Sequence, residues 1–408
     1  MGRKNIRRGE FLKAAATATA GLMIVKPESV RGTPANSALR VGIIGCGGRG
    51  RFIARFFPEH TNAKIVALAD PFKNRVDDLK KDLEANKKEG IRAGTALDDA
   101  HCFVGLDAYK PLIESGVDAV AIESPPYFHP EQAAAAVAAG KHVFMAKPVA
   151  VDVPGCRSIL ASSEKAKGRL SFLVDFQTRS SPIFIEAAKR VHEGAIGEPV
   201  SGQVFYQAAR LGVKAAPKDK SDAARLLNWV FDKILSGDIL VEQNIHVLDV
   251  SNWYLQSHPI KAYGTGGRKA RTDVGDCWDH FIVIYWYPND VRMDFSSGQY
   301  LKGFGDLCIR LYGTLGTVDS HYGGDVRITG TNEWPGGSTK EIYQEGAITN
   351  VKAFVESITT GKFINTGAPG AESTLTSVLG RIAAYRGAVV TWDEMMKENA
   401  KLETQLKL

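Results

Sequence analysis

The first half of the chain alternates short apolar runs with amphipathic stretches. The apolar runs predict strands at residues 40–44, 64–69, 119–122 and 142–145. Apolar residues at helical spacing between these runs predict helices at residues 51–57, 75–85, 108–115 and 130–139. Strands that alternate with helices in this way form a parallel, doubly wound sheet, and a further strand at residues 171–174 is expected to close it.

The pattern changes after residue 201. Alternating apolar and polar positions predict strands at residues 202–209, 280–287, 291–297, 307–312 and 318–321. This alternation is typical of an open, mostly antiparallel sheet with one covered face. Helices are predicted at residues 239–254, 348–360 and 371–387. The fold class is therefore α/β, with an N-terminal parallel sheet and a C-terminal α+β domain.

A glycine-rich turn follows the first predicted strand directly, and a helical pattern begins straight after it. In such a strand–turn–helix, the first glycine permits a tight turn and the second lets the backbone approach a pyrophosphate. The third lets the helix pack on the strand, and the helix N-terminus faces the anion. The turn predicts a dinucleotide-binding (Rossmann) domain with cofactor contacts at Gly45, Gly47, Gly48, Arg49 and Gly50.

Asp70 ends the second predicted strand and bears on the choice of cofactor. It lies about where a ribose-binding carboxylate is expected, roughly 20 residues beyond the turn. A carboxylate at this place accepts hydrogen bonds from both ribose hydroxyls and repels a 2′-phosphate, so NAD is the expected cofactor. Arg49 and Arg75 keep NADP as the alternative, because arginine can hold that phosphate.

The formal net charge of +6 is concentrated at the N-terminus. Residues 1–38 hold seven basic and two acidic side chains, which accounts for +5, so the charge of the remainder does not indicate a nucleic-acid partner. Arg7 and Arg8 precede a mild apolar run at residues 14–25, which is too short and alanine-rich for a membrane span. This segment resembles a twin-arginine signal and implies a periplasmic, exported protein, with a disordered cytosolic tail as the alternative.

The cysteines are odd in number and have no Cys-x-x-Cys spacing. This pattern argues against a disulfide framework and against a structural zinc site. We therefore expect five small buried residues and no metal: Cys46, Cys102, Cys156, Cys277 and Cys308.

Further landmarks follow the glycine turn in a fixed order. They are Ala69-Asp70-Pro71, residues 124–129, residues 138–143, Ala146-Lys147-Pro148, and residues 194–199, 312–317 and 380–385. The ordered set resembles the glucose–fructose oxidoreductase / inositol dehydrogenase family, often written Gfo/Idh/MocA, over nearly everything from Leu39 onward. The resemblance implies that NAD or NADP binds the first domain and that a sugar or polyol binds against the second sheet.

The pattern along the chain, together with the resemblance, divides the chain into parts. Residues 1–38 would be the export signal and linker, and residues 39–166 the dinucleotide-binding domain. Residues 167–408 would be the substrate-binding and oligomerisation domain, with a C-terminal helix that packs back. A homodimer or homotetramer is expected, because an open sheet face often supports a dimer in similar proteins.

Lys147 is the first candidate for catalysis. Oxidation of a secondary alcohol requires that a hydride leave the carbon for the nicotinamide and that a proton leave the hydroxyl for a base. Lys147 ends a predicted strand at the carboxyl edge of the parallel sheet, where ligands bind. In similar proteins the lysine of a Glu-Lys-Pro motif lies by the nicotinamide and the reacting hydroxyl, which implies both roles for Lys147. Ala146 replaces the glutamate of that motif.

Glu242 and His246 are four residues apart and are predicted to share one helical face, so that both reach one ligand. Related proteins carry Asp-x-x-x-His at this place, which implies an acid/base role for His246 and substrate binding by Glu242. Asn244 and Asp249 are further substrate candidates, and Asp249 could also orient His246. The spacing would also allow both residues to bind one zinc ion, but no third ligand is evident nearby. The other alternative is a polar helix with a purely structural role.

Two other segments supply weaker candidates. Gln177 and Arg179 follow the strand between the domains and could hold sugar hydroxyls or the nicotinamide amide; a solvated arginine is the alternative. Ser124, Pro125 and His129 belong to a loop that is expected to contact the cofactor. The alternative for His129 is that it caps the helix that follows.

Together these residues predict an exported NAD-dependent oxidoreductase. It would transfer a hydride between a secondary alcohol of a sugar, polyol or glycoside and a tightly bound nicotinamide cofactor. One alternative is an NAD-dependent glycoside hydrolase of the same fold, which oxidises its substrate transiently and eliminates the aglycone. The other is a non-catalytic sugar-binding protein with a vestigial cofactor site.

Overall fold

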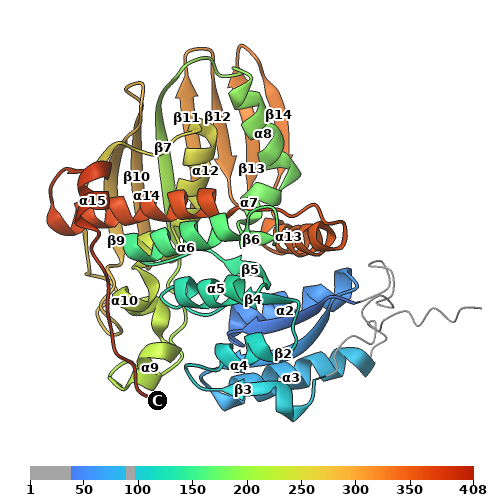
Figure 1. Cartoon of the computed structure of the whole chain (residues 1–408). Helices are drawn as coiled ribbons and strands as arrows, with labels where there is room; N and C mark the ends of the chain where they lie inside the picture. Colours follow the sequence, from blue (N-terminus) through green and yellow to red (C-terminus); the bar gives the residue numbers. More distant parts are fainter. Residues whose placement is uncertain (1–37, 89–96) are drawn as a thin grey trace, which may run out of the picture. The chain divides into compact units, whose positions relative to one another are not determined.

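A six-stranded parallel sheet forms from the first half of the chain (Figure 1). The computed structural model describes residues 38–88 and 97–408, so the predicted export signal lies outside the described residues. The strand order β3-β2-β1-β4-β5-β6 is that of a doubly wound dinucleotide fold, which confirms the prediction. The strands are β1 (Arg40–Ile44), β2 (Lys64–Asp70), β3 (Cys102–Val104), β4 (Ala119–Ile122), β5 (His142–Ala146) and β6 (Phe172–Asp175).

Helices connect these strands and cover both faces of the sheet. They are α2 (Gly48–His60), α3 (Lys73–Lys88), α4 (Tyr109–Glu114), α5 (His129–Ala138) and α6 (Val153–Ala166), with a short turn η2 (Asp99–His101) before β3. Every residue of β4 and β6 is buried, which explains their uninterrupted apolar sequences. β6 belongs to this sheet, so the sheet extends beyond residue 166, the predicted end of the domain.

A nine-stranded sheet forms the second half, in the order β14-β13-β12-β11-β7-β10-β9-β8-β15. β7 and β10 pair in parallel, whereas the other neighbouring pairs are antiparallel, as the sequence predicted. The strands are β7 (Pro199–Ala208), β8 (Lys261–Gly267), β9 (His280–Trp286), β10 (Arg292–Gln299), β11 (Asp306–Gly313), β12 (Gly316–His321), β13 (Asp325–Gly330), β14 (Trp334–Ser338) and β15 (Val390–Thr391).

Four of these strands were not predicted from the sequence. β8 and β14 are rich in glycine, and β15 has two residues, so their apolar alternation is weak. β13 offers two buried positions, Val326 and Ile328, between exposed residues. Their place in the sheet follows from pairing with neighbours rather than from local hydrophobicity.

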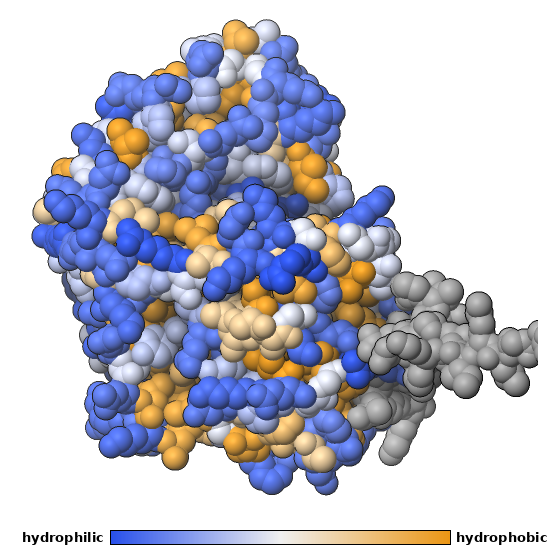
Figure 2. Space-filling model, in the orientation of Figure 1, coloured by the Kyte–Doolittle hydropathy of each residue, from blue (hydrophilic) through white to orange (hydrophobic). Residues whose placement is uncertain are grey.

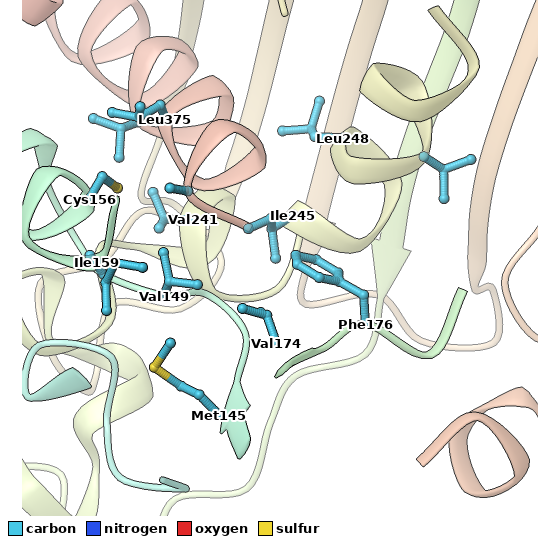
Figure 3. Packing of buried hydrophobic residues seen from close by; sticks show 14 of the residues in the cluster. Met145, Val149, Cys156, Ile159, Val174, Phe176, Val241, Ile245, Leu248 and Leu375 are labelled. Atoms are coloured by element: carbon cyan, nitrogen blue, oxygen red, sulfur yellow. The ribbon is translucent and has the colours of Figure 1, made fainter. Parts of the chain in front are cut away.

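One face of the second sheet is covered by helices. α8 (Pro182–His192), α12 (Ile245–Leu255) and α14 (Gly367–Arg386) pack on it, and α14 also packs against α6 of the first half. Side chains of both halves meet in one buried apolar cluster (Figure 3), including Met145, Val149, Val174, Val241, Ile245 and Leu375. Such burial fixes residues of the two halves relative to one another.

The remaining helices are short, except α13 (Ile342–Thr359), which packs against α2 of the first half. They are α7 (Gln177–Ser180), α9 (Asp222–Leu227), η3 (Trp229–Phe231), α10 (Lys233–Ser236), α11 (Ile239–Glu242), α13 (Ile342–Thr359) and α15 (Trp392–Glu398). On the face drawn in Figure 2, hydrophobic residues occur in small groups between hydrophilic ones. Across the described ranges, no helix combines the length and apolar character that crossing a membrane requires. All five cysteines are described; they are free, and four of them are buried.

Candidate active site

A cavity of about 720 Å³ lies at the carboxyl ends of the parallel strands. Residues of the first half that line it include the glycine turn, Asp70, Ser124, Pro125 and Lys147. From the second half come Gln177, Tyr206, parts of segment 211–230, Glu242, Gln243 and His246. This edge is where a doubly wound sheet binds its ligands.

The glycine turn leaves room for a close backbone approach. Gly45 has a φ angle of +96°, and a Cβ there would lie 2.6 Å from the Ser124 amide nitrogen. A Cβ on Gly50 would lie 1.9 Å from the Gly45 carbonyl oxygen. Gly47 is the N-cap of α2 and lines the cavity, and it has no side chain to occupy the N–H groups of the first turn. These groups suit the pyrophosphate of a dinucleotide.

Asp70 lines the cavity although its exposed fraction is only 3%. Its Oδ2 accepts a hydrogen bond from the Cys46 amide at 2.8 Å, and its Oδ1 accepts one from the Phe72 amide at 2.9 Å. Burial raises the pKa of this carboxyl, and the amide donors and Arg75 oppose the rise. Because each carboxylate oxygen has a second lone pair, Asp70 can hold the turn and accept from a ribose hydroxyl as well.

Lys147 follows β5 and reaches the second half of the chain. Its Nζ donates to the Glu242 carbonyl oxygen at 2.6 Å and to Glu242 Oε1 at 3.2 Å. Both side chains line the cavity, with exposed fractions of 15% for Lys147 and 12% for Glu242. A cation and a carboxylate therefore meet in the lining of the cavity that the glycine turn also lines.

His246 lines the same cavity from the first turn of α12. Burial lowers the pKa of its imidazole well below the ordinary range, and the charges of Lys147 and Arg49 lower it further. The imidazole is therefore neutral at pH 7 and can accept a proton. Its Nδ1 is buried and has no hydrogen-bond partner within the described part of the chain.

Glu242 and His246 do not share a helical face, so that prediction was wrong. α11 ends at Glu242, and α12 begins at Ile245 after Gln243 and Asn244. The spacing rule for residues i and i+4 holds only in a continuous helix. The two side chains reach one cavity because the connection between the helices forms part of its wall.

His129 lies outside the cavity lining, contrary to the predicted cofactor contact. It is fully buried, and its Nδ1 and Nε2 lie 2.8 Å from the carbonyl oxygens of Pro148 and Ser124. Burial lowers the pKa of its imidazole to about 4. His129 therefore connects the Ser124–Pro125 loop to the segment after Lys147 and does not itself reach a ligand.

Three predicted substrate residues are also not among those that line the cavity. Arg179 donates to Asp249 through Nε at 2.9 Å and through Nη2 at 3.0 Å, and Asp249 is fully buried. Ser373 Oγ donates to the same carboxylate at 2.7 Å. Asn244 has an exposed fraction of 1%. Direct substrate binding by Arg179, Asn244 and Asp249 does not fit this placement, whereas Gln177 does line the cavity.

A buried charge cluster at the cavity was not found from the sequence. Arg49 pairs with Asp175, and its Nε lies 4.0 Å from Glu123 Oε2. Glu123 follows β4 directly and Asp175 ends β6, so both stand at the carboxyl edge of the parallel sheet. Their place straight after an apolar run was the signal that could have identified them.

Segment 211–230 was also missed, because its sequence shows no periodicity. It contributes cavity-lining residues, among them Leu211, Lys214 and residues 226–230. Asn228 organises the segment, since its Oδ1 accepts from the amides of Lys214 at 2.8 Å and Ala215 at 3.1 Å.

A second group of polar residues lies apart from this cavity, on β11 and β12. Asp306, Cys308 and His321 place potential ligand atoms within 4.8 Å of one another. His321 Nδ1 already lies 2.7 Å from Asp306 Oδ1, and Arg310 pairs with the adjacent Asp319. These contacts account for the group as an ion-pair network.

Two family models match the chain in succession. The model described as an oxidoreductase family with an NAD-binding Rossmann fold matches residues 39–174. The model described as the GFO/IDH/MocA C-terminal domain matches residues 184–319.

Similar proteins and structures agree with these models. Inositol 2-dehydrogenase 1 of Saccharopolyspora erythraea is 26% identical over 284 residues, which are 69% of this chain and 73% of that protein. The scyllo-inositol 2-dehydrogenase (NAD(+)) of Bacillus subtilis is 26% identical over 285 residues, with the same shares covered. The crystal structure of an aldose-aldose oxidoreductase from Caulobacter crescentus, complexed with glycerol, has a TM-score of 0.69 at 20% identity and covers 87% of this chain and 100% of that chain. Because the two models match residues 39–174 and 184–319 in succession, the chain belongs to the Gfo/Idh/MocA family of oxidoreductases, and its first domain is an NAD-binding Rossmann domain.

Proposed function

We propose that the protein oxidises a secondary alcohol of a sugar or polyol with NAD, or reduces the corresponding ketone with NADH. One observation carries the proposal: Lys147, Glu242 and His246, from the two halves of the chain, line the same cavity as the glycine turn. The names of the relatives support the substrate class, since they act on inositols or aldoses.

His246 is the proposed base for the hydroxyl proton. Its pKa lies below the ordinary range, so the neutral imidazole is available to accept this proton. The Lys147 ammonium stabilises negative charge that develops on the same oxygen. NAD, when bound, would supply the hydride acceptor for the carbon, and His246 would hold the hydroxyl proton as the alcohol becomes a ketone. Glu242 holds the Lys147 ammonium in position by accepting hydrogen bonds at its carbonyl oxygen and its carboxylate. The same carboxylate can also accept a hydrogen bond from a substrate hydroxyl.

We propose NAD rather than NADP as the cofactor. Asp70 stands at the end of β2 and lines the cavity, where its carboxylate would repel a 2′-phosphate. Arg75 lines the same region and lies over the Phe72 ring, with 5.0 Å between its Cζ and the ring centroid. This contact accounts for Arg75 without a phosphate.

We further propose a periplasmic location and a homo-oligomer. Export rests on Arg7, Arg8 and the apolar run that follows them. Self-association rests on the uncovered face of the second sheet, where Tyr263, Ile282 and Ile284 are exposed on β8 and β9. Light scattering of the purified protein tests the second proposal, and fusion of residues 1–38 to a reporter tests the first.

The function is tested by first purifying the folded protein, denaturing it and identifying the released nucleotide by mass spectrometry. NAD(H) is expected, because an exported enzyme must carry its cofactor out of the cytosol. A screen of inositols, aldoses and aryl glycosides then follows NADH absorbance and aglycone release. Formation of a ketone together with NADH would support the dehydrogenase function. Release of the aglycone without net formation of NADH would instead support the glycoside hydrolase. A protein that holds no nucleotide and gains no thermal stability from NAD would contradict both.

A further inference from the structure

Glu123 is a buried carboxylate for which the proposed chemistry has no use. Its side chain has no exposed surface, and neither oxygen has a hydrogen-bond partner among residues 38–88 and 97–408. A buried carboxylate without donors is costly, so such a group calls for an explanation. Glu123 lines the same cavity as the glycine turn and Lys147, which makes a ligand of that cavity the natural source of donors.

Arg49 offers the complementary unpaired group. Its Nη2 pairs with Asp175, while its Nη1 is buried and finds no acceptor in the described structure. The rings of Phe52 and Tyr343 hold the guanidinium, each with its centroid 5.1 Å from Cζ. Two acceptor oxygens of Glu123 and one donor of Arg49 are therefore left over in one cluster at the cavity wall.

Asp175 is satisfied by contrast. Its Oδ1 accepts from Asn350 Nδ2 at 2.7 Å, and its Oδ2 accepts from Arg49. Burial raises the pKa of Glu123 to about 8, with Arg49 lowering it and Asp175 raising it. Glu123 thus lacks hydrogen-bond donors that would favour its ionised form, and hydroxyl groups from a ligand would provide them.

Glu123 of this cluster lies near both the glycine turn and Lys147, a residue of the proposed reacting site. A Cβ on Gly50 would lie 3.6 Å from Glu123 Cβ, which places Glu123 against the glycine turn. Ile122 pairs with Met145 between β4 and β5, so Glu123 stands beside Ala146, one residue before Lys147. A ligand that extends from the glycine turn to Lys147 would therefore lie close to Glu123.

We propose that Glu123 and Arg49, whose unpaired polar atoms are closed to solvent in this structure, turn toward the cavity and bind a vicinal diol. Two hydroxyls donate to the Glu123 oxygens, and one hydroxyl oxygen accepts from Arg49 Nη1. An ionised phosphate has no donor for Glu123, and an apolar group satisfies neither side chain. The inference rests on the proposed function, which supplies two ligands with vicinal diols: the nicotinamide-side ribose of NAD and the polyol. The contact with the glycine turn favours the ribose as the expected source.

The test measures binding by titration calorimetry, without turnover. The probes are NAD and an NAD analogue whose nicotinamide-side ribose lacks the 2′-hydroxyl; myo-inositol is then titrated into NAD-saturated protein. Glu123→Gln keeps the shape of the side chain and removes its charge, and Glu114→Gln on the exposed end of α4 is the matched control. We expect Glu123→Gln to weaken NAD binding roughly tenfold or more, and wild type to bind the analogue weaker than NAD by a similar factor. The control should bind NAD as wild type does.

Each outcome decides the inference. A loss confined to myo-inositol affinity would support it and assign the diol to the substrate. If wild type binds NAD and the analogue equally and Glu123→Gln leaves myo-inositol affinity unchanged, the inference is wrong while the proposed function stands. The wild-type comparison needs no variant, so it decides the ribose assignment even if Glu123→Gln does not fold. Wild type that bound neither NAD nor myo-inositol would overturn both proposals.

Discussion

The Lys147 ammonium lies 2.6 Å from the backbone carbonyl oxygen of Glu242 and connects the parallel sheet to α11 across 95 residues of sequence. Both side chains also line the cavity. The contact therefore borders the proposed reaction and, at the same time, joins the two halves of the chain. Neither hydrogen bond of Lys147 involves the glycine turn, so changes at Lys147 should affect chemistry more than cofactor retention.

Alanine at Lys147 or His246 should remove most of the turnover and leave NAD bound. Proton-transfer groups contribute roughly 10²–10⁴-fold to the rate. If both groups serve one proton transfer, the double variant should be little slower than the slower single variant. Steady-state kinetics on the polyol found by screening, with nucleotide content checked for each variant, measures this. Near-normal turnover of His246→Ala would return α12 to a structural role.

Asp70→Ala should weaken NAD binding and narrow the preference for NAD over NADP. A hydrogen bond to a charged group is worth about 1.5–3 kcal/mol, which corresponds to a tenfold or greater change in affinity. Asp70→Asn retains one acceptor oxygen for a backbone amide and serves as the comparison for damage to the turn. Fluorescence titration with both nucleotides provides the measurement; equal NAD affinity in all three proteins would refute the ribose assignment.

Arg179→Met should destabilise the fold without changing NAD affinity. The substitution leaves Asp249 fully buried with Ser373 as its remaining side-chain donor, and removal of one partner of a buried ion pair costs about 3–5 kcal/mol. Replacement of both partners, as in Arg179→Met/Asp249→Leu, should recover part of this stability. Urea unfolding gives the free energies. A stable Arg179→Met protein with a raised KM for polyol would instead restore Arg179 to the substrate site.

His129 should make the fold less stable in mild acid. Its pKa is lowered to about 4 in the folded protein, whereas an unfolded histidine titrates near 6.5. Between these values the unfolded chain binds a proton that the folded chain does not, so the free energy of unfolding falls as pH falls. Above pH 6.5 both states have a neutral His129 and no stability is lost from this source. The loss grows as the pH falls and reaches about 3 kcal/mol at pH 4. Urea unfolding from pH 7 to 4.5 should show that the free energy of unfolding falls less in His129→Asn than in wild type. Parallel curves for the two proteins would show that His129 is not the source of the acid sensitivity.

Residues 402–408 should help to hold segment 211–230 at the cavity. This end of the chain runs past α10 toward α9 (Figure 1). Lys407 N donates to Asp222 Oδ2 at 2.8 Å, and Tyr127 Oη donates to the Thr404 carbonyl oxygen at 3.2 Å. A variant without residues 402–408 should exchange the amides of segment 211–230 faster and bind NAD a few-fold more weakly, because each lost hydrogen bond contributes about 1 kcal/mol. Hydrogen exchange with mass spectrometry checks this; unchanged exchange would show that Asn228 alone suffices.

The sequence by itself determined the parallel sheet, the glycine turn and the positions of Asp70 and Lys147. Each depends on neighbouring residues. The buried strands β1 and β4 show as apolar runs, and Gly45 allows a φ angle of +96°. The carboxyl end of a strand marks the ligand edge in any doubly wound sheet, so residues there could be assigned without a structure.

Only the tertiary structure decided which polar side chains reach the cavity. Arg179 is paired with a residue 70 positions away and Arg49 with one 126 positions away, and neither pairing leaves a local pattern. The break between Glu242 and Ile245 contains neither glycine nor proline, so propensity gave no reason to interrupt the helix. The burial of a polar side chain and its hydrogen-bond partners depend on which distant elements pack around it. For this reason Glu123 could be identified as an unpaired carboxylate only from the folded structure.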